Sequence, residues 1–171
     1  PYSYYLERIL SIEENELNFF SRIGTIFHAV MKDLYQNPAF LFETSWAEAI
    51  AEEVEKNGTF TPKENALFLR LKEECSYAVR FYQAHDSFLP DPLFRTEESF
   101  ALTSPENPLV TFKGQFDKII SFGKEKRFFV ILDYKTGSER FSEKLLPYGL
   151  SLQLPYYAYF AMNDPSLQGE E

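Results

Sequence analysis

"VILDYKTG", residues 130–137, is the stretch that decides the fold, because it begins as a buried strand and then introduces charges. In an extended strand alternate side chains share a face, so Asp133 and Lys135 lie on one face and Tyr134 on the other. A strand covered on both faces tolerates a charge only when that charge is paired or binds a metal. The alternative is that the strand surfaces into water here and the two charges form a half-exposed ion pair.

Further acids along the sequence favour the metal interpretation. Asp117 lies sixteen residues before Asp133 inside the apolar segment "FKGQFDKII", residues 112–120, and the turn between the two strands predicts a hairpin that brings both carboxylates together. Glu98 lies in the preceding strand, and His28 lies beside the apolar stripe of an early helix. Carboxylates with at most one imidazole are the ligands that Mg²⁺ or Mn²⁺ prefers, and a nearby lysine can hold a water or stabilise charge on a phosphate.

The periodicity of apolar residues predicts an α/β chain whose first half is helical. Helices are expected over 21–37, 45–56 and 62–85, strands over 94–102, 109–121 and 128–135, and a last helix over 151–162. We expect one domain over 1–171, mainly helical over 1–90, with a core of strands and a helix over 91–162 and a flexible tail over 163–171. The chain begins without Met and in an aromatic pattern typical of a helix within a domain, which indicates a piece of a longer protein.

Composition limits the classes of function. With 44% apolar and 18% aromatic residues the chain can bury a core, and its net charge of −9 argues against a protein that coats duplex DNA. The acidity suits a domain that holds divalent cations, or one whose substrate is delivered by another part of a larger machine. A single cysteine, Cys75, allows no internal disulfide and indicates a reducing compartment, and no apolar run approaches the roughly 20 residues of a membrane span. We therefore expect a cytoplasmic protein.

Four segments in a fixed order resemble a known family. They are "GTIFHAV" (24–30), "GQFDKI" (114–119), "VILDYKTG" (130–137) and "LQLPYYAYF" (152–160). Over about residues 1–160 the chain resembles the nuclease domain of the RecB-like branch of the PD-(D/E)xK superfamily, found at the C-terminal end of AddB/RexB-type subunits of bacterial helicase–nucleases. The resemblance implies a restriction-endonuclease-like core, with a small mixed β-sheet flanked by helices and the strand over 128–135 at its centre.

The resemblance also implies roles for the residues that match the motifs. His28 falls on the metal-ligating histidine of a helix, and Asp117 and Asp133 fall on the two acidic metal ligands. Tyr134 falls on a ligand through its backbone carbonyl, and Lys135 falls on the catalytic lysine.

Other residues are implied to contact the substrate. Gln153 and Tyr157 match the Q-x-x-x-Y helix of the family, and their i, i+4 spacing places them on one helical face. The loop "GSERFSEKLLPYG", with Arg140 and Lys144, is expected to contact the DNA backbone. Glu98 matches weakly an acidic residue of the first core strand.

The implied function is Mg²⁺- or Mn²⁺-dependent hydrolysis of DNA phosphodiesters. The resemblance further implies single-stranded DNA delivered by a helicase partner, a role in double-strand break repair and recombination, and no membrane contact. Many AddB-type domains hold an iron–sulfur cluster on four cysteines, and with Cys75 alone we expect no cluster in this chain. Two alternatives stay open: an inactive nuclease-fold module for structure or DNA-end binding, and a metal-dependent phosphohydrolase for small substrates. The second alternative would predict a glycine-rich phosphate loop, which seven scattered glycines do not form.

Overall fold

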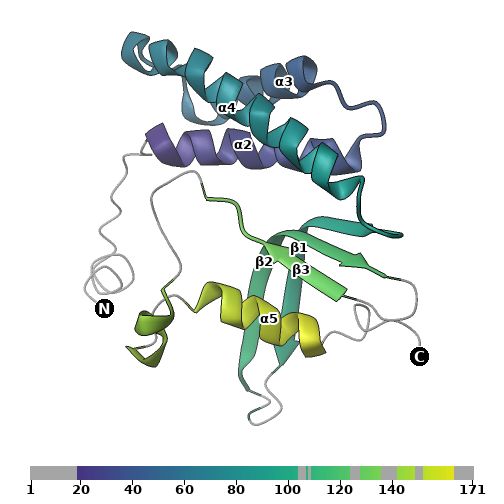
Figure 1. Ribbon diagram of the computed structural model, residues 1–171. Helices are drawn as coiled ribbons and strands as arrows, with labels where there is room; N and C mark the ends of the chain where they lie inside the picture. The colour runs from purple at the N-terminus through teal and green to yellow at the C-terminus, as the bar shows by residue number, and fades with distance from the viewer. Residues whose placement is uncertain are drawn as a thin grey trace, which may run out of the picture.

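The computed structural model describes residues 19–103, 107, 109–123, 128–135, 142–148 and 152–163. Within these residues three helices come first, then three strands, a short 3-10 helix and a last helix (Figure 1). The elements are α2 (Phe19–Gln36), α3 (Phe42–Asn57), α4 (Pro62–Asp86), β1 (Leu93–Thr103), β2 (Thr111–Phe122), β3 (Phe128–Leu132), η2 (Glu143–Tyr148) and α5 (Gln153–Asn163). The order confirms the expected α/β class and the helical first half. None of these helices is long and apolar enough to cross a membrane.

The three N-terminal helices pack into one layer above the sheet (Figure 1). The apolar stripe expected on the first helix is confirmed, since Ile23, Val30 and Met31 of α2 are buried in the core of this layer. Thr61 and Glu64 start α4 with reciprocal side-chain to backbone hydrogen bonds, the capping box that satisfies N–H groups without helical partners. Tyr134, from the segment after β3, completes the same core and so joins the strand end to the helices.

The sheet has the order β1-β2-β3 and corrects two details of the expectation. The described strands pair antiparallel throughout, where we expected a mixed sheet, and β2 is central in place of the strand over 128–135. The physical reason is the connections, since consecutive strands joined by short turns pair antiparallel and a parallel pair needs a crossover of a dozen or more residues. The predicted hairpin of the second and third strands is confirmed, with Lys118 opposite Leu132.

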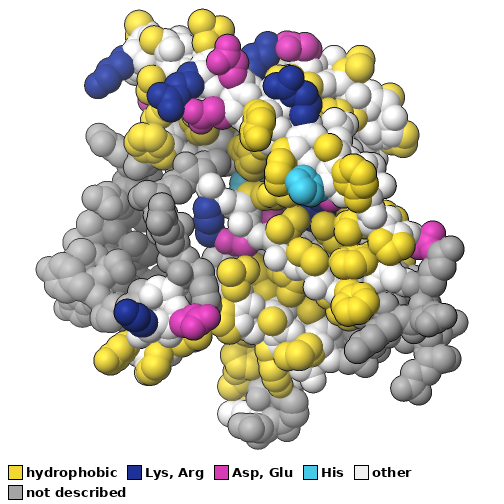
Figure 2. Space-filling model, viewed as in Figure 1, with side chains coloured by type: hydrophobic (Ala, Val, Ile, Leu, Met, Phe, Trp, Pro, Cys, Tyr) yellow, Lys and Arg dark blue, Asp and Glu magenta, His cyan; other side chains and the backbone are white. Residues whose placement is uncertain are grey.

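A second core lies between the sheet and α5, which crosses the face of the sheet turned toward the viewer in Figure 1. Phe100 and Phe116 from the strands contact Tyr157 and Phe160 of α5, with ring centroids 4.0–5.8 Å apart. Hydrophobic side chains cover much of the lower part of this side of the molecule, while charged ones gather over the helical layer (Figure 2).

A buried ion pair ties β2 to the helical layer. Lys118 is fully buried, and its Nζ lies 2.6 Å from Oδ2 of Asp86 at the end of α4. The Tyr35 hydroxyl of α2 donates to the same oxygen at 2.5 Å, and the ammonium lies 3.9 Å from the centroid of the Tyr35 ring. Burial lowers the pKa of Lys118, and the hydrogen bond and charge of Asp86 oppose that effect. Helices α2 and α4 and strand β2 are thus held together around the ammonium of Lys118, the residue that follows Asp117 in the sequence.

Candidate metal centre

The register of the sheet places three acids in one row across the strands. Glu97 lies between the two β1 residues that pair with positions 116 and 118 of β2, so it lies opposite Asp117. Lys118 pairs with Leu132, so the next position after β3, Asp133, lies opposite Asp117 on the other side. Residues directly opposite in an antiparallel pair have neighbouring side chains. The fold therefore brings together acids that lie 36 positions apart along the sequence.

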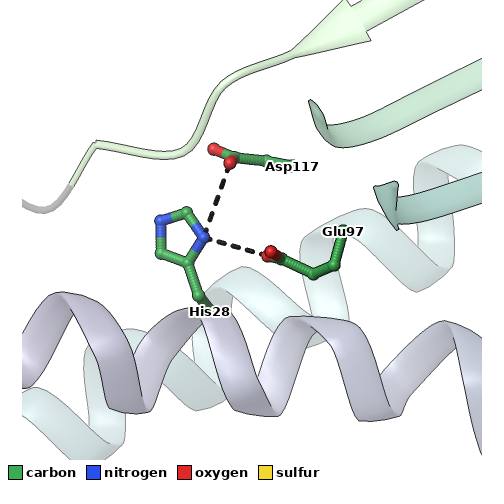
Figure 3. A group of neighbouring side chains, drawn as sticks. All are labelled: His28, Glu97 and Asp117. Atoms are coloured by element: carbon green, nitrogen blue, oxygen red, sulfur yellow. Dashed lines mark hydrogen bonds and ion pairs between the residues drawn. The ribbon is translucent and has the colours of Figure 1, made fainter. Parts of the chain in front are cut away.

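His28 of α2 meets two of these acids (Figure 3). Its Nδ1 lies 3.1 Å from Oε1 of Glu97 and 3.6 Å from Oδ1 of Asp117. The three side chains keep 30%, 17% and 12% of their surface exposed for His28, Glu97 and Asp117, so the group is reachable from solvent while its two acids are largely shielded. The structure therefore brings His28 and Asp117 together, and their role as metal ligands stays a prediction.

Each of the two carboxylates has one oxygen held by a hydrogen bond and the other turned toward His28. The backbone N–H of Tyr134 donates to Oδ2 of Asp117 at 2.5 Å, while Oδ1 faces the histidine. The Gln115 side-chain amide donates to Oε2 of Glu97 at 3.0 Å, while Oε1 faces the histidine. Hydrogen bonds of this kind orient metal ligands and are part of the design of metal sites. The two acids are thus oriented before any ion binds.

Glu97 adopts a backbone conformation that is rare for its residue type. Its φ is 51°, in the left-handed region that costs a side-chain-bearing residue free energy and that is concentrated at functional sites. Gln115 donates to the carbonyl oxygen of Glu97 at 3.0 Å as well as to its carboxylate. One amide on β2 therefore holds both the backbone and the side chain of Glu97 in place.

The electrostatics of the group favour a positive partner. Burial raises the pKa of Asp117, and the negative charges of Asp133 and Glu97 act in the same direction. The hydrogen bond from Tyr134 and the charge of His28 oppose this rise. A cation placed among these groups would relieve the repulsion that disfavours the Asp117 carboxylate.

A second set of polar contacts links Asp133 to α5. Lys135 Nζ lies 2.9 Å from Oδ2 of Asp133 and donates to Oε1 of Gln153 at 3.1 Å. The Gln153 amide donates to Oδ1 of Asp133 at 2.7 Å and to the Tyr157 hydroxyl at 3.0 Å. The ion pair of Asp133 with Lys135 agrees with the alternative interpretation of this stretch, and Gln153 and Tyr157 lie on one helical face, as their spacing predicts.

The remaining predicted residues fall in different places. Asp133 lies outside the group formed by His28, Glu97 and Asp117, called the His28 group below. Its described contacts are to Lys135 and Gln153, and its role as a metal ligand stays a prediction. The Tyr134 ring is buried in the helical core, and its role through the backbone carbonyl also stays a prediction. Lys144 is exposed on η2, and Arg140 lies outside the described residues.

The sequence alone did not reveal Glu97 or Gln115. Of the two adjacent glutamates we named Glu98, whose carboxylate pairs with Arg95 on the same strand. Adjacent strand residues point to opposite faces, so only the register decides between Glu97 and Glu98. Counting back from Asp117 through the β1–β2 hairpin would have found Glu97, had the length of the turn been known.

The His28 group fits a divalent cation. The nearest ligand atoms of His28, Glu97 and Asp117 all lie within 4.8 Å of one another. Ligands bound to one hard cation at about 2.0–2.6 Å lie up to about 5 Å apart, and two carboxylates with one imidazole suit Mg²⁺ or Mn²⁺.

A family model described as the PD-(D/E)XK nuclease superfamily matches residues 1–171, the whole chain. The chain belongs to the PD-(D/E)XK nuclease superfamily. Members of the superfamily are generally metal-dependent nucleases that act on DNA, which agrees with the acids and lysine described above. The predicted membership of this superfamily is confirmed, and the RecB-like branch stays a prediction. Neither a curated protein nor a solved structure matches the chain.

Proposed function

We propose that this nuclease-superfamily chain is a Mg²⁺- or Mn²⁺-dependent deoxyribonuclease domain of the RecB-like branch. The observation that carries the proposal is the juxtaposition of two polar groups. The His28, Glu97 and Asp117 group lies beside the contacts of Asp133, Lys135 and Gln153, because Asp117 and Asp133 are opposite each other across β2 and β3. Both chemical parts of a phosphodiester hydrolase are thus present: acidic ligands lie in one row across the sheet, and a lysine lies just beyond the end of β3.

The residues of the chain divide the work. His28, Glu97 and Asp117 would hold the cation, with Asp133 as a further acid at the same row of the sheet. When bound, the cation supplies Lewis-acid charge to the scissile phosphate and lowers the pKa of a water. Lys135 is oriented by Asp133 and Gln153, so its ammonium can hold the attacking water or stabilise charge that develops on the phosphate.

The substrate of this proposal is single-stranded DNA delivered by a helicase subunit or domain, in double-strand break repair and recombination in the cytoplasm. The order of the four motifs supports that partner. The net charge of −9 also supports it, because a chain with 26 acidic and 17 basic residues gains little non-specific attraction to DNA and benefits from delivery.

A second candidate is an inactive nuclease-fold module that binds DNA ends or has a structural role. The contacts of Asp133 favour it, since both of its carboxylate oxygens have partners in Lys135 and Gln153 and the residue lies outside the His28 group. If Asp133 stays bound to Lys135 and Gln153, it cannot serve as a metal ligand.

Lys135→Ala separates the two candidates. The variant should bind Mn²⁺ as the wild type does in calorimetry and lose about 10²–10⁴-fold in cleavage of single-stranded DNA, because the lysine acts chiefly during reaction. Asp133→Ala should lose affinity for Mn²⁺ and cleavage together. Lys56→Ala is the matched control, since Lys56 is also an ion-paired lysine but lies on the exposed side of α3.

Chelation provides the complementary test. Excess EDTA should abolish cleavage by the wild type, and added Mn²⁺ should restore it. Wild-type protein that binds Mn²⁺ and DNA without cleaving the strand would support the inactive module. If Lys135→Ala cleaves DNA at the wild-type rate, Lys135 has no role in the proposed reaction.

A further inference from the structure

Glu97 has a φ of 51° within β1, although the pairing around it is regular. The residues on either side of it pair with positions 118 and 116 of β2, so the register is the same before and after Glu97. No extra residue is inserted here, so a β-bulge, which commonly gives a strand residue an unusual conformation, does not explain the angle. The left-handed conformation of Glu97 must therefore depend on its side-chain contacts.

Glutamate is a poor residue type for this conformation. Positive φ values suit Gly, and also Asn and Asp with their short polar side chains. Among the described residues the other non-glycine residue with a positive φ is Asp91, which precedes β1. A residue keeps a sparsely populated conformation only when its surroundings determine it, and such residues cluster at functional sites. The contacts of Glu97 show which neighbour does so.

One side chain of β2, Gln115, contacts both the backbone and the carboxylate of Glu97. Its Nε2 donates to the Glu97 carbonyl oxygen and to Oε2, each at 3.0 Å. The amide nitrogen carries two hydrogens in fixed directions, so one group orients both oxygens together. Gln115 is exposed, and water could satisfy the same oxygens almost as well. The contribution that water cannot make is to fix the direction of the carboxylate.

We propose that Gln115 is a positioning residue of the metal centre and that it sets how many waters a bound cation keeps. The inference rests on the proposed function and deepens it, because it concerns the coordination of the same cation. With Oε2 held by Gln115, Oε1 of Glu97 faces Nδ1 of His28 at 3.1 Å (Figure 3). Without Gln115, Glu97 can return to ordinary strand geometry, and a water takes the place of its oxygen on the cation.

A second glutamine makes the same kinds of contact one residue earlier on β1. Gln36 of α2 donates from Nε2 to the carbonyl oxygen and to Oγ1 of Thr96, at 3.3 and 3.1 Å. Thr96 is outside the His28 group. The bonds of Gln36 are partly buried and those of Gln115 are exposed, so Gln36 should contribute more to the stability of the fold. Gln36 is therefore the matched control for Gln115.

The test is binding of Mn²⁺ to the whole chain in the absence of DNA. Calorimetry gives the Kd, and the relaxation of water protons gives the number of waters on the bound ion. Gln115→Met keeps the length of the side chain and removes its donors. We expect the Kd to rise about tenfold and the bound ion to carry an additional water. Gln36→Met should leave the Kd within about twofold and the number of waters unchanged, even where its melting temperature falls.

Glu97→Ala provides the background in which the effect of Gln115 must disappear. There Gln115→Met should change the Kd by no more than about twofold, because no carboxylate remains to be oriented. A larger change in that background would contradict the positioning role, because Gln115 would then act on the cation without Glu97.

Three other results would also overturn the positioning role. If Gln115→Met binds Mn²⁺ with the wild-type Kd and number of waters, Gln115 positions nothing and the nuclease function stands. If Gln36→Met weakens binding as much, a general loosening of β1 explains both variants. If Gln115→Met does not fold, the residue serves the fold. A wild-type chain that neither binds Mn²⁺ nor cleaves DNA would overturn the proposed function and this inference together.

Discussion

Replacing Asp86 by Asn would test how strongly the buried ion pair holds β2 to the helices. Asn keeps the shape of the side chain and an oxygen for Tyr35 and Lys118, and it removes the charge. The Lys118 side chain is fully buried, so its ammonium would lose its partner without access to water. Removing one member of a buried pair costs about 3–5 kcal/mol in free energy of unfolding.

An independent limit comes from deprotonation. A lysine that cannot keep its charge in the fold releases its proton, and at pH 7 this costs a lysine of ordinary pKa 10.5 about 4.8 kcal/mol. Deprotonation therefore limits the cost of the unpaired ammonium, and the retained oxygen of Asn reduces the total cost. We expect a loss of about 3 kcal/mol at pH 7.

The pH dependence identifies the cause of the loss. Asp86 opposes the effect of burial on Lys118, so without the carboxylate the pKa of Lys118 falls further in the folded state. Between that lowered pKa and 10.5 the unfolded chain binds a proton that the folded chain does not, and stability rises with pH by up to about 1.4 kcal/mol per pH unit. The deficit of the variant should therefore shrink between pH 7 and pH 9.

Urea denaturation of both proteins at pH 7, 8 and 9 measures this trend. Glu74→Gln is the control, since Glu74 pairs with Arg70 at 2.9 Å on the exposed side of α4 and its loss should cost at most about 0.5 kcal/mol at every pH. A deficit of Asp86→Asn below about 1 kcal/mol, or one that does not change with pH, would refute the reasoning.

Three further changes test the site and the sheet. Glu97→Gln should weaken Mn²⁺ binding in calorimetry at least about tenfold, whereas Glu98→Gln should leave it within about twofold; equal effects would exclude Glu97 as a ligand. Gly114→Ala should lower the free energy of unfolding by about 1–3 kcal/mol, because its Cβ would lie 2.8 Å from Cε1 of Phe100, and an unchanged denaturation midpoint would contradict this. Asp117→Asn should stabilise the metal-free protein by about 1 kcal/mol at pH 7. Since burial raises the pKa of Asp117, that gain should disappear as the pH falls through the raised pKa toward 3.8; a gain that persists there would contradict it.

The elements with strong periodicity could be predicted from the sequence. The apolar stripe of α2 and the β2–β3 hairpin both follow from local patterns of apolar residues. The hairpin aligns Asp133 opposite Asp117, and His28 of α2 lies near Asp117. The contact of Gln153 with Tyr157 follows from helix geometry alone.

What could not be predicted depends on register and on contacts between distant segments. Glu97 and Glu98 are equivalent in the sequence, and the choice between them depends on how β1 aligns with β2. Lys118 is a charged residue in an apolar strand, and its burial is tolerated because it pairs with Asp86 of α4. Neither fact is contained in a local pattern.

Helix α5 begins without the usual means of neutralising its positive end. Its first turn holds no acidic residue, and Leu152, the residue before it, has no side-chain oxygen to accept a backbone N–H. Asp133, which lies twenty residues earlier, accepts a hydrogen bond from the side chain of Gln153, the first residue of the helix, and so holds that end from another element. The acid that is expected to serve the reaction thereby also fastens the first residue of α5 to the segment that follows β3, so a change at Asp133 would also loosen the start of this helix.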